Sequence, residues 1–393
     1  MNDATHTFPI VPGDWLGMIG GGQLGRMFCH AAQSLGYKVA VLDPDEHSPA
    51  GAVAEWHIRA GYQDSAALAQ LSARCKAITT EFENVPAESL RTLALRSTVS
   101  PSGDAVAVVQ DRIREKAFIE GTGVPVAPYA PIRARSDIAA APAALFPGIL
   151  KVARLGYDGK GQARVASAQE ALEAFAQFQE AECVLEAMLP LASELSIVMA
   201  RGADGQTVRY APAQNEHRDG ILAVSTVDPS LLDAALAGQA AESAVRIAQA
   251  LDYVGVLCVE FFVLQDGSLV ANEIAPRPHN SGHYTMDACI TSQFEQQARA
   301  TAGLPLGDTG SLCPVVMLNL LGDLWFDPAS GAEREPDWRG VLAVPGARLH
   351  LYGKAQARRG RKMGHVNLLG ATLDEARERT ARVAQVLGIA FHP

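Results

Sequence analysis

The chain has 393 residues, of which 48% are hydrophobic and 19% are charged. This composition excludes a disordered chain, a collagen-like repeat and a small disulfide-stapled protein. The length predicts two or three domains, because one core rarely grows beyond about 300 residues. The formal net charge of −10 argues against nucleic acid as a partner, although it leaves room for a local basic pocket that binds a small anion.

The six cysteines are scattered, and no two have Cys-x-x-Cys spacing. Neither a zinc site nor a redox pair is therefore indicated, and reduced cysteines in a cytoplasmic protein are expected. The sequence shows no signal-peptide pattern and no apolar run of about 18 residues, so we expect no membrane association. These features favour a cytoplasmic α/β enzyme.

The first domain is predicted over residues 1–110. Apolar strands at 15–19, 38–42 and 77–80 alternate with amphipathic helices at 26–35 and 66–75. Such alternation indicates a parallel, Rossmann-like sheet.

A glycine motif, Gly20-x-Gly22-x-x-Gly25, follows the first strand and opens the first helix, and Asp43 stands 18 residues after Gly25. This arrangement fits a dinucleotide-binding fingerprint, in which glycines admit a phosphate to a helix N-terminus. A plain Rossmann-like turn that binds no dinucleotide explains it equally well. The motif alone leaves both interpretations open.

The second domain is predicted over residues 111–190. We expect a charged helix at 111–120, strands at 148–153 and 163–166, a helix at 168–181 and a strand at 183–186. A glycine-rich segment, 155–162, joins the first two of these strands. Such a segment can cover phosphates with its backbone N–H groups, and Lys151 and Lys160 can offset phosphate charge. A surface hairpin with a snorkelling lysine is the alternative.

The third domain is predicted over residues 191–393, with a small terminal subdomain from about residue 335. We expect strands near 195–200 and 207–211, a long helix at 229–251, a hairpin at 255–274 and a final helix at 373–387. The composition and pattern indicate a sheet that is mainly antiparallel, covered by helices.

The hairpin brings two glutamates together in apolar surroundings. Asp266-Gly267 predicts a two-residue turn, which pairs Gln265 with Ser268, Val263 with Val270 and Glu260 with Glu273. Opposed like charges destabilise a sheet unless a cation or proton joins them. Hard oxygen ligands with Asn272 beside them suit Mg²⁺. A solvated sheet face with two ordinary glutamates is the alternative.

Five segments occur in order: Gly21–Met27, Glu81–Asn84, Gly156–Gln162, Asn272–His283 and Gly360–His365. With them the chain resembles the ATP-grasp superfamily and, within it, the N5-carboxyaminoimidazole ribonucleotide synthases of purine biosynthesis. The resemblance runs from about residue 14 to the C-terminus, and Asn272–His283 is its most specific part. It implies an α/β (α+β) ATP-grasp fold with an N-terminal Rossmann-like domain, a small lid domain and a C-terminal mixed-sheet domain.

The resemblance also implies a reaction. In this family ATP and bicarbonate give carboxyphosphate and ADP, and the exocyclic amine of 5-aminoimidazole ribonucleotide takes up the carboxyl group, directly or after release of CO₂. Bicarbonate and carboxyphosphate would be held by Arg277, His279 and Asn280, with Lys151 also catalytic. The metal, Mg²⁺ or alternatively Mn²⁺, would be held by Glu260 and Glu273. The resemblance further suggests a homodimer.

The ATP site that the resemblance implies combines phosphate contacts, the glycine-rich lid, the strand beside the adenine and groups near the ribose and metal. Its members are Arg112, Lys151, Gly156, Tyr157, Asp158, Gly159, Lys160, Gly161, Gln162, Glu186, Ala187, Met188, Leu189, Glu194, His217, Asn272 and Glu273.

Residues 354–365 form a basic island without an acid in this acidic chain. A solvated loop is one interpretation. The other is a site for the ribose phosphate of 5-aminoimidazole ribonucleotide, and the resemblance favours Lys354 and Arg361 there, with Tyr157, Asp158 and Arg277 also in the substrate site.

Four alternatives compete with this interpretation. Within the superfamily, a formate-using glycinamide ribonucleotide transformylase or a biotin carboxylase-like component would share the ATP site. An NAD-dependent oxidoreductase would use the N-terminal glycine motif but leaves the glutamate pair unexplained. A non-catalytic nucleotide sensor would not need the charged site residues.

Overall fold

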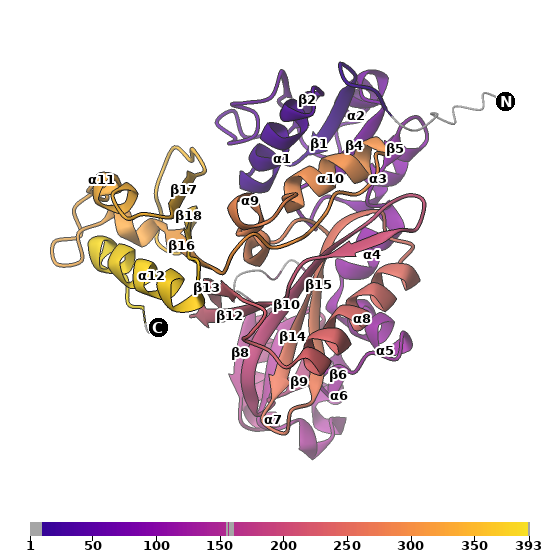
Figure 1. The fold of residues 1–393 in the computed structure, drawn as a ribbon. Helices are drawn as coiled ribbons and strands as arrows, with labels where there is room; N and C mark the ends of the chain where they lie inside the picture. The colour runs from indigo at the N-terminus through magenta and orange to yellow at the C-terminus, as the bar shows by residue number, and fades with distance from the viewer. Residues whose placement is uncertain (1–9, 155, 157–160, 392–393) are drawn as a thin grey trace.

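The computed structural model describes residues 10–154, 156 and 161–391, and the chain forms three sheets (Figure 1). The N-terminal sheet is parallel, with the strand order β3-β2-β1-β4-β5. Its strands are β1 (Trp15–Ile19), β2 (Lys38–Leu42), β3 (Trp56–Ile58), β4 (Ala77–Thr80) and β5 (Thr98–Val99), and its helices are α1 (Gln23–Ser34), α2 (Ser65–Arg74), α3 (Ala87–Ala94) and α4 (Gly103–Val109). The expected strands at 15–19, 38–42 and 77–80 are confirmed.

The second sheet is antiparallel, with the order β6-β9-β7-β8. Apolar residues of its strands and of helices α6 and α7 form its core, which includes Leu150 and Phe175. The elements are α5 (Arg112–Gly121), β6 (Tyr129–Ile132), α6 (Arg135–Ala140), the 3₁₀ turn η1 (Ala143–Leu145), β7 (Gly148–Val152), β8 (Gln162–Val165), α7 (Ala168–Gln177) and β9 (Cys183–Ala187).

The large sheet is antiparallel and follows the order β15-β14-β10-β12-β13-β16-β18-β17, with β11 paired to β10. Its strands are β10 (Leu191–Arg201), β11 (Thr207–Arg209), β12 (Ala213–Arg218), β13 (Ile221–Val227), β14 (Gly255–Leu264), β15 (Leu269–Ala275), β16 (Val315–Leu321), β17 (Ala347–Leu351) and β18 (Lys362–Leu369). The helical elements are α8 (Ala234–Ala250), η2 (Asn280–Gly282), α9 (Thr285–Ala288), α10 (Gln293–Ala302), η3 (Gly322–Trp325), α11 (Trp338–Leu342) and α12 (Leu373–Leu387).

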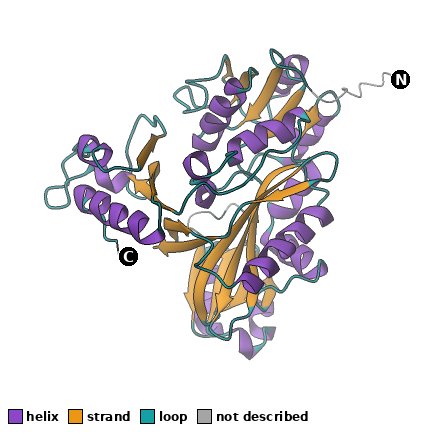
Figure 2. Ribbon diagram, in the orientation of Figure 1, coloured by secondary structure: helices purple, strands orange, loops and turns teal. Residues whose placement is uncertain are grey.

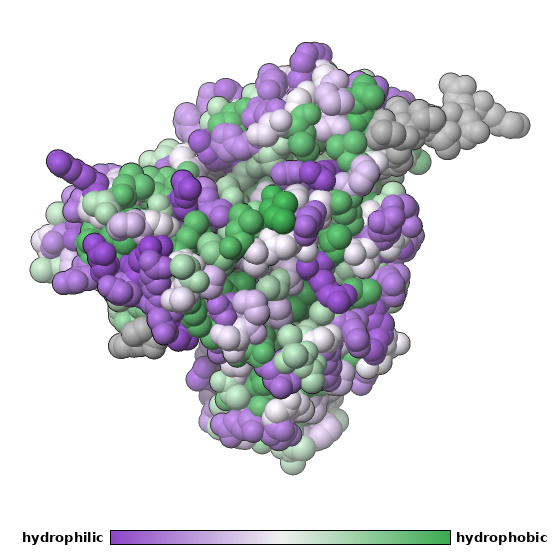
Figure 3. All heavy atoms as spheres, viewed as in Figure 1, coloured by the Kyte–Doolittle hydropathy of each residue, from purple (hydrophilic) through white to green (hydrophobic). Residues whose placement is uncertain are grey.

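Two helices pack the large sheet against other parts of the chain. Helix α8 lies alongside β14 and β15 (Figure 2) and packs its alanines and Ile247 into their shared core. Helix α10 instead reaches the N-terminal sheet, where Ala298 and Ala302 join the core formed with β1 and β2. The last strands and α12 form a lobe of their own, over which hydrophilic residues gather (Figure 3).

The predicted hairpin exists, but its turn is not the expected two-residue turn. Three residues, 265–267, form the loop, with Gly267 at φ 83°, and Val263 pairs with Leu269 rather than with Val270. A bulge at Asn272 then shifts the register by one residue, so Glu260 does face Glu273. The pairing of the glutamates was therefore predicted correctly from an incorrect turn.

The described residues include no helix that is long and apolar enough to cross a membrane.

Candidate functional site

The N-terminal glycine motif is occupied by side chains of the protein itself. Gly22 N–H and Gly25 N–H donate to the two carboxylate oxygens of Glu81, the latter at 2.7 Å, and Gly21 N–H donates to Asp43 at 2.7 Å. A Cβ on Gly20 would lie 2.4 Å from Glu81 Cγ. The glycines therefore admit a carboxylate of the same chain to the start of α1, where a dinucleotide would present its phosphate.

The two opposed glutamates each have a basic partner. Glu273 Oε2 lies 2.8 Å from Arg112 Nη1, and Glu260 Oε1 lies 2.9 Å from His279 Nε2. Burial alone would raise the pKa of Glu260, but His279, with His217 and Arg277, outweighs it and holds that pKa well below its usual range. Glu260 therefore remains an anion within an otherwise apolar strand pair.

The donors around this pair fit a magnesium ion. No three His, Cys, Asp or Glu side chains come together as metal ligands in the described part of the chain. Mg²⁺ commonly uses only one or two protein carboxylates and completes its shell with phosphate and water. Asn272 Oδ1 is buried without a hydrogen-bond partner at the bulge between the glutamates. Two carboxylates and one unpartnered amide oxygen are hard ligands of the required kind.

A second charged cluster surrounds Glu186 on β9. Its Oε2 lies 3.1 Å from Nζ of both Lys151 and Lys116, while its Oε1 is buried without a partner. Burial lowers the pKa of Lys151 and nearby Lys116 adds to this effect, whereas Glu186 opposes it. The sequence analysis missed Lys116, which is 1% exposed on α5, one turn after Arg112. The Arg-x-x-x-Lys spacing on one helix face was the signal that could have found it.

The residues expected along the adenine and ribose are divided between two places. Strand β9 ends at Ala187, so only the first two of the residues 186–189 expected beside the adenine lie on a strand, and Met188 is exposed. Glu194 on β10 and His217 on β12 lie together, with His217 Nδ1 2.6 Å from Glu194 Oε2. Burial lowers the pKa of His217, but Glu194 together with Glu260 and Glu273 outweighs it and raises that pKa.

The segment after β15 holds the three expected bicarbonate residues. Arg277 Nε lies 2.5 Å from Glu83 Oε2, which the N-terminal domain supplies. His279 connects this segment to the glutamate pair through Glu260. Asn280 is 7% exposed, and among the described residues neither its amide oxygen nor its amide nitrogen has a hydrogen-bond partner. A buried, unpartnered amide can both donate to and accept from a small oxyanion.

The lid is described only in part. Tyr157, Asp158, Gly159 and Lys160 lie outside the described residues. Gly161 follows them at φ 71°, and Gln162 begins β8 opposite Lys151. Gly156 is described as a single half-buried residue.

The basic island lies on the C-terminal lobe and approaches the N-terminal domain. Lys354 Nζ donates to Lys362 O at 2.6 Å. Burial raises the pKa of Glu81 beside the glycine motif, and the charge of Lys354 partly opposes this. Arg361 Nη1 donates to Gln356 O at 2.8 Å. Lys354 therefore faces another domain, whereas Arg361 is held within its own loop.

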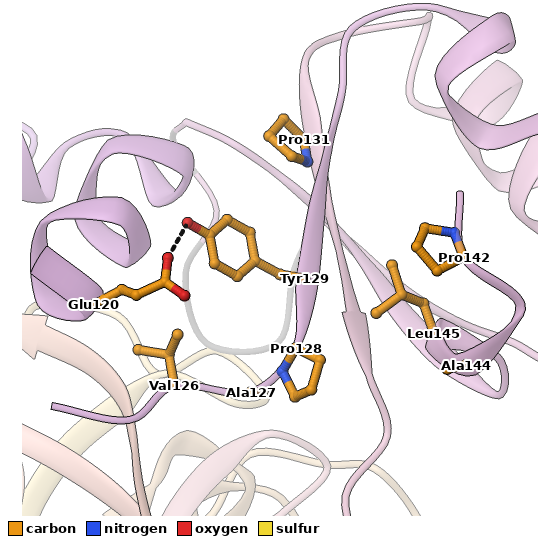
Figure 4. A pocket seen from close by; sticks show the side chains of 9 residues that line it. All are labelled: Glu120, Val126, Ala127, Pro128, Tyr129, Pro131, Pro142, Ala144 and Leu145. Atoms are coloured by element: carbon orange, nitrogen blue, oxygen red, sulfur yellow. Dashed lines mark hydrogen bonds between the residues drawn. The ribbon is translucent and has the colours of Figure 1, made fainter. Parts of the chain in front are cut away.

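A cavity of about 590 Å³ lies elsewhere, between α5, β6 and η1 (Figure 4). Prolines and apolar residues line much of it, and Tyr129 Oη donates to Glu120 across one side at 3.5 Å. None of the residues expected to bind ATP, substrate or metal belongs to its lining. The cavity is thus separate from the site residues described above.

Comparisons with known proteins identify the family of the chain and its domains. The ribonucleotide synthetase preATP-grasp domain matches residues 14–110, the ATP-grasp domain matches 117–294, and the phosphoribosylaminoimidazole carboxylase C-terminal domain matches 315–379. The N5-carboxyaminoimidazole ribonucleotide synthase of Brucella melitensis is 47% identical over 360 residues, which cover 91% of this chain and 96% of the relative. The synthase of Bacillus subtilis is 40% identical over 367 residues, which cover 93% of this chain and 94% of the relative.

Solved structures of such enzymes are also similar. The ADP complex of an N5-carboxyaminoimidazole ribonucleotide synthetase has a TM-score of 0.89 and 40% identity, covering 98% of this chain and 99% of its own. The Aspergillus clavatus synthase, bound to ADP and 5-aminoimidazole ribonucleotide, has a TM-score of 0.86 and 30% identity. The match covers 96% of this chain and 99% of that chain.

Proposed function

Since the chain belongs to the N5-carboxyaminoimidazole ribonucleotide synthases of the ATP-grasp superfamily, we propose that it uses ATP and bicarbonate to carboxylate 5-aminoimidazole ribonucleotide for purine biosynthesis. The γ-phosphoryl group of ATP passes to bicarbonate to give carboxyphosphate and ADP. The exocyclic amine of the substrate then takes up the carboxyl group, directly or as released CO₂, and phosphate leaves.

The contact between Glu260 and His279 carries this proposal. It joins the glutamate pair to the segment that contains Arg277 and Asn280. Phosphoryl transfer to bicarbonate requires charge neutralisation and positioning rather than an enzyme nucleophile. Arg112 and Lys151 would neutralise the ATP phosphates, and Asn280 would hold the bicarbonate through its unpartnered amide.

The metal and the lid have supporting roles in this proposal. Glu260 and Glu273 would hold Mg²⁺, or alternatively Mn²⁺, which supplies positive charge to the phosphates. Residues 156–162 would close over the site and exclude the water that hydrolyses carboxyphosphate. Lys354 and Arg361 would receive the ribose phosphate of the substrate, with Arg277, Tyr157 and Asp158 nearby.

Release of ADP tests the proposal directly. We expect ADP release that requires 5-aminoimidazole ribonucleotide, bicarbonate and Mg²⁺ together, measured with a coupled assay in degassed buffer to which bicarbonate is added back. ADP release that ignores the ribonucleotide would refute the proposal. Dependence on formate or on a biotin carrier would favour the alternative ligases.

The same assay, applied to a variant of Glu273, tests the proposed metal-binding role of Glu260 and Glu273. Glu273→Gln should lower kcat/KM for Mg-ATP by at least about 100-fold, because it removes one anionic ligand at the phosphates. Glu242→Gln, at an exposed position on α8, is the control and should retain activity. Unchanged Mg²⁺-dependent turnover of Glu273→Gln would refute the role of the glutamate pair.

Location and assembly complete the proposal. All six cysteines are free, five of them buried, which supports a reducing, cytoplasmic location. A homodimer is supported by the family, and sedimentation at micromolar protein concentration would test it.

A further inference from the structure

A row of polar side chains crosses the large sheet and leads to His279. Ser196 on β10 faces Glu260 on β14, and Asn215 on β12 faces Ser225 on β13. Because opposed residues share a face, and Ser196 faces Ala213 two residues before Asn215, all four polar residues lie on one face. All are at least nine-tenths buried except Glu260, whose side chain is 12% exposed.

Hydrogen bonds join this row into one chain whose donors can all point toward His279. Ser225 Oγ donates to Asn215 Oδ1 at 2.7 Å, and Asn215 Nδ2 donates to Ser196 Oγ at 3.0 Å. Ser196 Oγ accepts this hydrogen bond and keeps its own hydroxyl proton, which it can donate to Ser281 Oγ at 2.7 Å, a contact in which either oxygen can be the donor. Ser281 Oγ can then donate a hydrogen bond to His279 Nδ1, which lies 2.8 Å away.

Both ends of the imidazole agree with this direction. The backbone N–H of Ser281 also points at His279 Nδ1, at 3.4 Å, which marks Nδ1 as an acceptor. The ring proton is then on Nε2, which lies 2.9 Å from Glu260 Oε1. Gln293, fully buried, holds the backbone of the same residue by accepting from His279 N–H and donating to His279 O, each at 2.8 Å.

We propose that Ser225, Asn215, Ser196 and Ser281 are positioning residues that keep His279 in the tautomer with its proton on Nε2 and its ring turned toward Glu260. The chain acts only through His279, whose Nε2 contacts Glu260 Oε1. This inference rests on the proposed function, because its effect on catalysis requires that His279 belongs to the active site.

The kinetic test interrupts the chain at its middle. Ser196→Ala removes the hydroxyl that links Asn215 to Ser281 and should lower kcat by about 10- to 100-fold, with KM for ATP changed less than about twofold. Ser196→Thr keeps a hydroxyl and should recover most of kcat. Ser243→Ala, which removes a buried serine hydroxyl from α8, is the matched control and should keep kcat.

The spectroscopic test reads the tautomer itself. In protein with ¹⁵N-labelled histidine and no substrate, the His279 signals are assigned by their loss in His279→Gln. The wild type should show an unprotonated Nδ1, and Ser196→Ala should move that signal toward a mixture of tautomers. A proton on Nδ1 in the wild type, or a folded Ser196→Ala with wild-type kcat, would overturn the proposal.

A further variant keeps the test decisive if Ser196→Ala does not fold. Ser225→Ala removes only the far end of the chain and should still shift the Nδ1 signal and lower kcat; if both stay unchanged, the proposal fails. If the wild-type protein releases no ADP in response to 5-aminoimidazole ribonucleotide, the proposed function is refuted. The ¹⁵N signature needs no substrate and would still decide the hydrogen-bond chain.

Discussion

Glu81 is a carboxylate that the fold has buried against the start of α1. Burial raises its pKa to about 6, although the N–H groups of Gly25 and Gly22 partly oppose this. A raised pKa means that the folded state binds this proton more tightly than the unfolded state, where the value is near 4.5. Its contribution to stability is therefore complete below about pH 4.5 and is lost as pH rises through about 6.

This linkage predicts a pH-dependent difference between two proteins. From pH 4.5 to 7 the wild type should lose about 2 kcal/mol of unfolding free energy relative to Glu81→Gln, which cannot titrate. Urea unfolding at a series of pH values measures this difference in unfolding free energy. Glu378→Gln, at an exposed position, is the control. Parallel pH profiles for wild type and Glu81→Gln would contradict the burial of a titrating carboxylate.

Helix α10 is the element that joins the large sheet to the N-terminal sheet. Ala298 and Ala302 are buried in the N-terminal core, while Phe294 packs against Leu24 and Met27 of α1. Gln297 accepts from Val256 N–H of β14 at 2.6 Å and donates to Thr79 Oγ1 of β4. One buried amide therefore satisfies polar groups of two different sheets.

Loss of that amide should weaken the whole fold. Gln297→Leu leaves Val256 N–H and the Thr79 hydroxyl unsatisfied and should cost about 1–3 kcal/mol of unfolding free energy. The urea midpoint should fall with little change in m-value, whereas Gln249→Leu at an exposed position of α8 should leave the midpoint nearly unchanged. Equal midpoints for the two variants would show that α10 does not depend on this amide.

At the scale of the whole molecule, the site is assembled from separate domains. Glu83, just after β4, contacts Arg277, just after β15, although the two residues are 194 positions apart. The Arg277 guanidinium lowers the pKa of Glu83 to about 2 against the effect of burial. This ion pair therefore adds to the docking of the N-terminal domain through α10 and holds the Arg277 guanidinium in its orientation.

Removal of Glu83 should affect stability and activity together. Glu83→Ala should cost about 2–3 kcal/mol, less than a fully buried pair, because about a fifth of the Arg277 side chain is exposed. Thermal unfolding measures the loss, and kcat should fall as Arg277 loses its orientation. Glu88→Ala, which breaks an exposed pair with Arg91, should cost less than about 1 kcal/mol. Similar losses in both variants would contradict a domain-joining role for Glu83.

The regular elements could be predicted where the pattern is local. Apolar runs gave β1, β2 and β4 with their observed bounds, and amphipathic spacing gave α12. The hairpin of β12 and β13 was not assigned, because its first strand is mostly polar. Asp219-Gly220 was the available signal, since both residues have positive φ and form its two-residue turn.

The residue types of the candidate site could be proposed from the sequence, but not their contacts. Charged and glycine-rich segments indicated which residues to expect at ATP and metal, and this stays a prediction, whereas the partners of these residues depend on contacts between distant strands. Nothing local to Ser196 indicated its hydrogen bond to Ser281, 85 positions away. The bulge at Asn272, likewise, compensates for a turn that the two-residue rule makes one residue too short.

The carboxylate that sits on the glycine motif has a consequence for ligand competition. Because Glu81 is tethered to the same sheet, its effective concentration at the N–H groups of Gly22 and Gly25 is in the millimolar range or above. A free dinucleotide phosphate would have to displace an internal ligand that never diffuses away. The Glu81 carboxylate thus competes intramolecularly for the anion-binding N–H groups at the start of α1, and a dissolved cofactor would bind there more weakly.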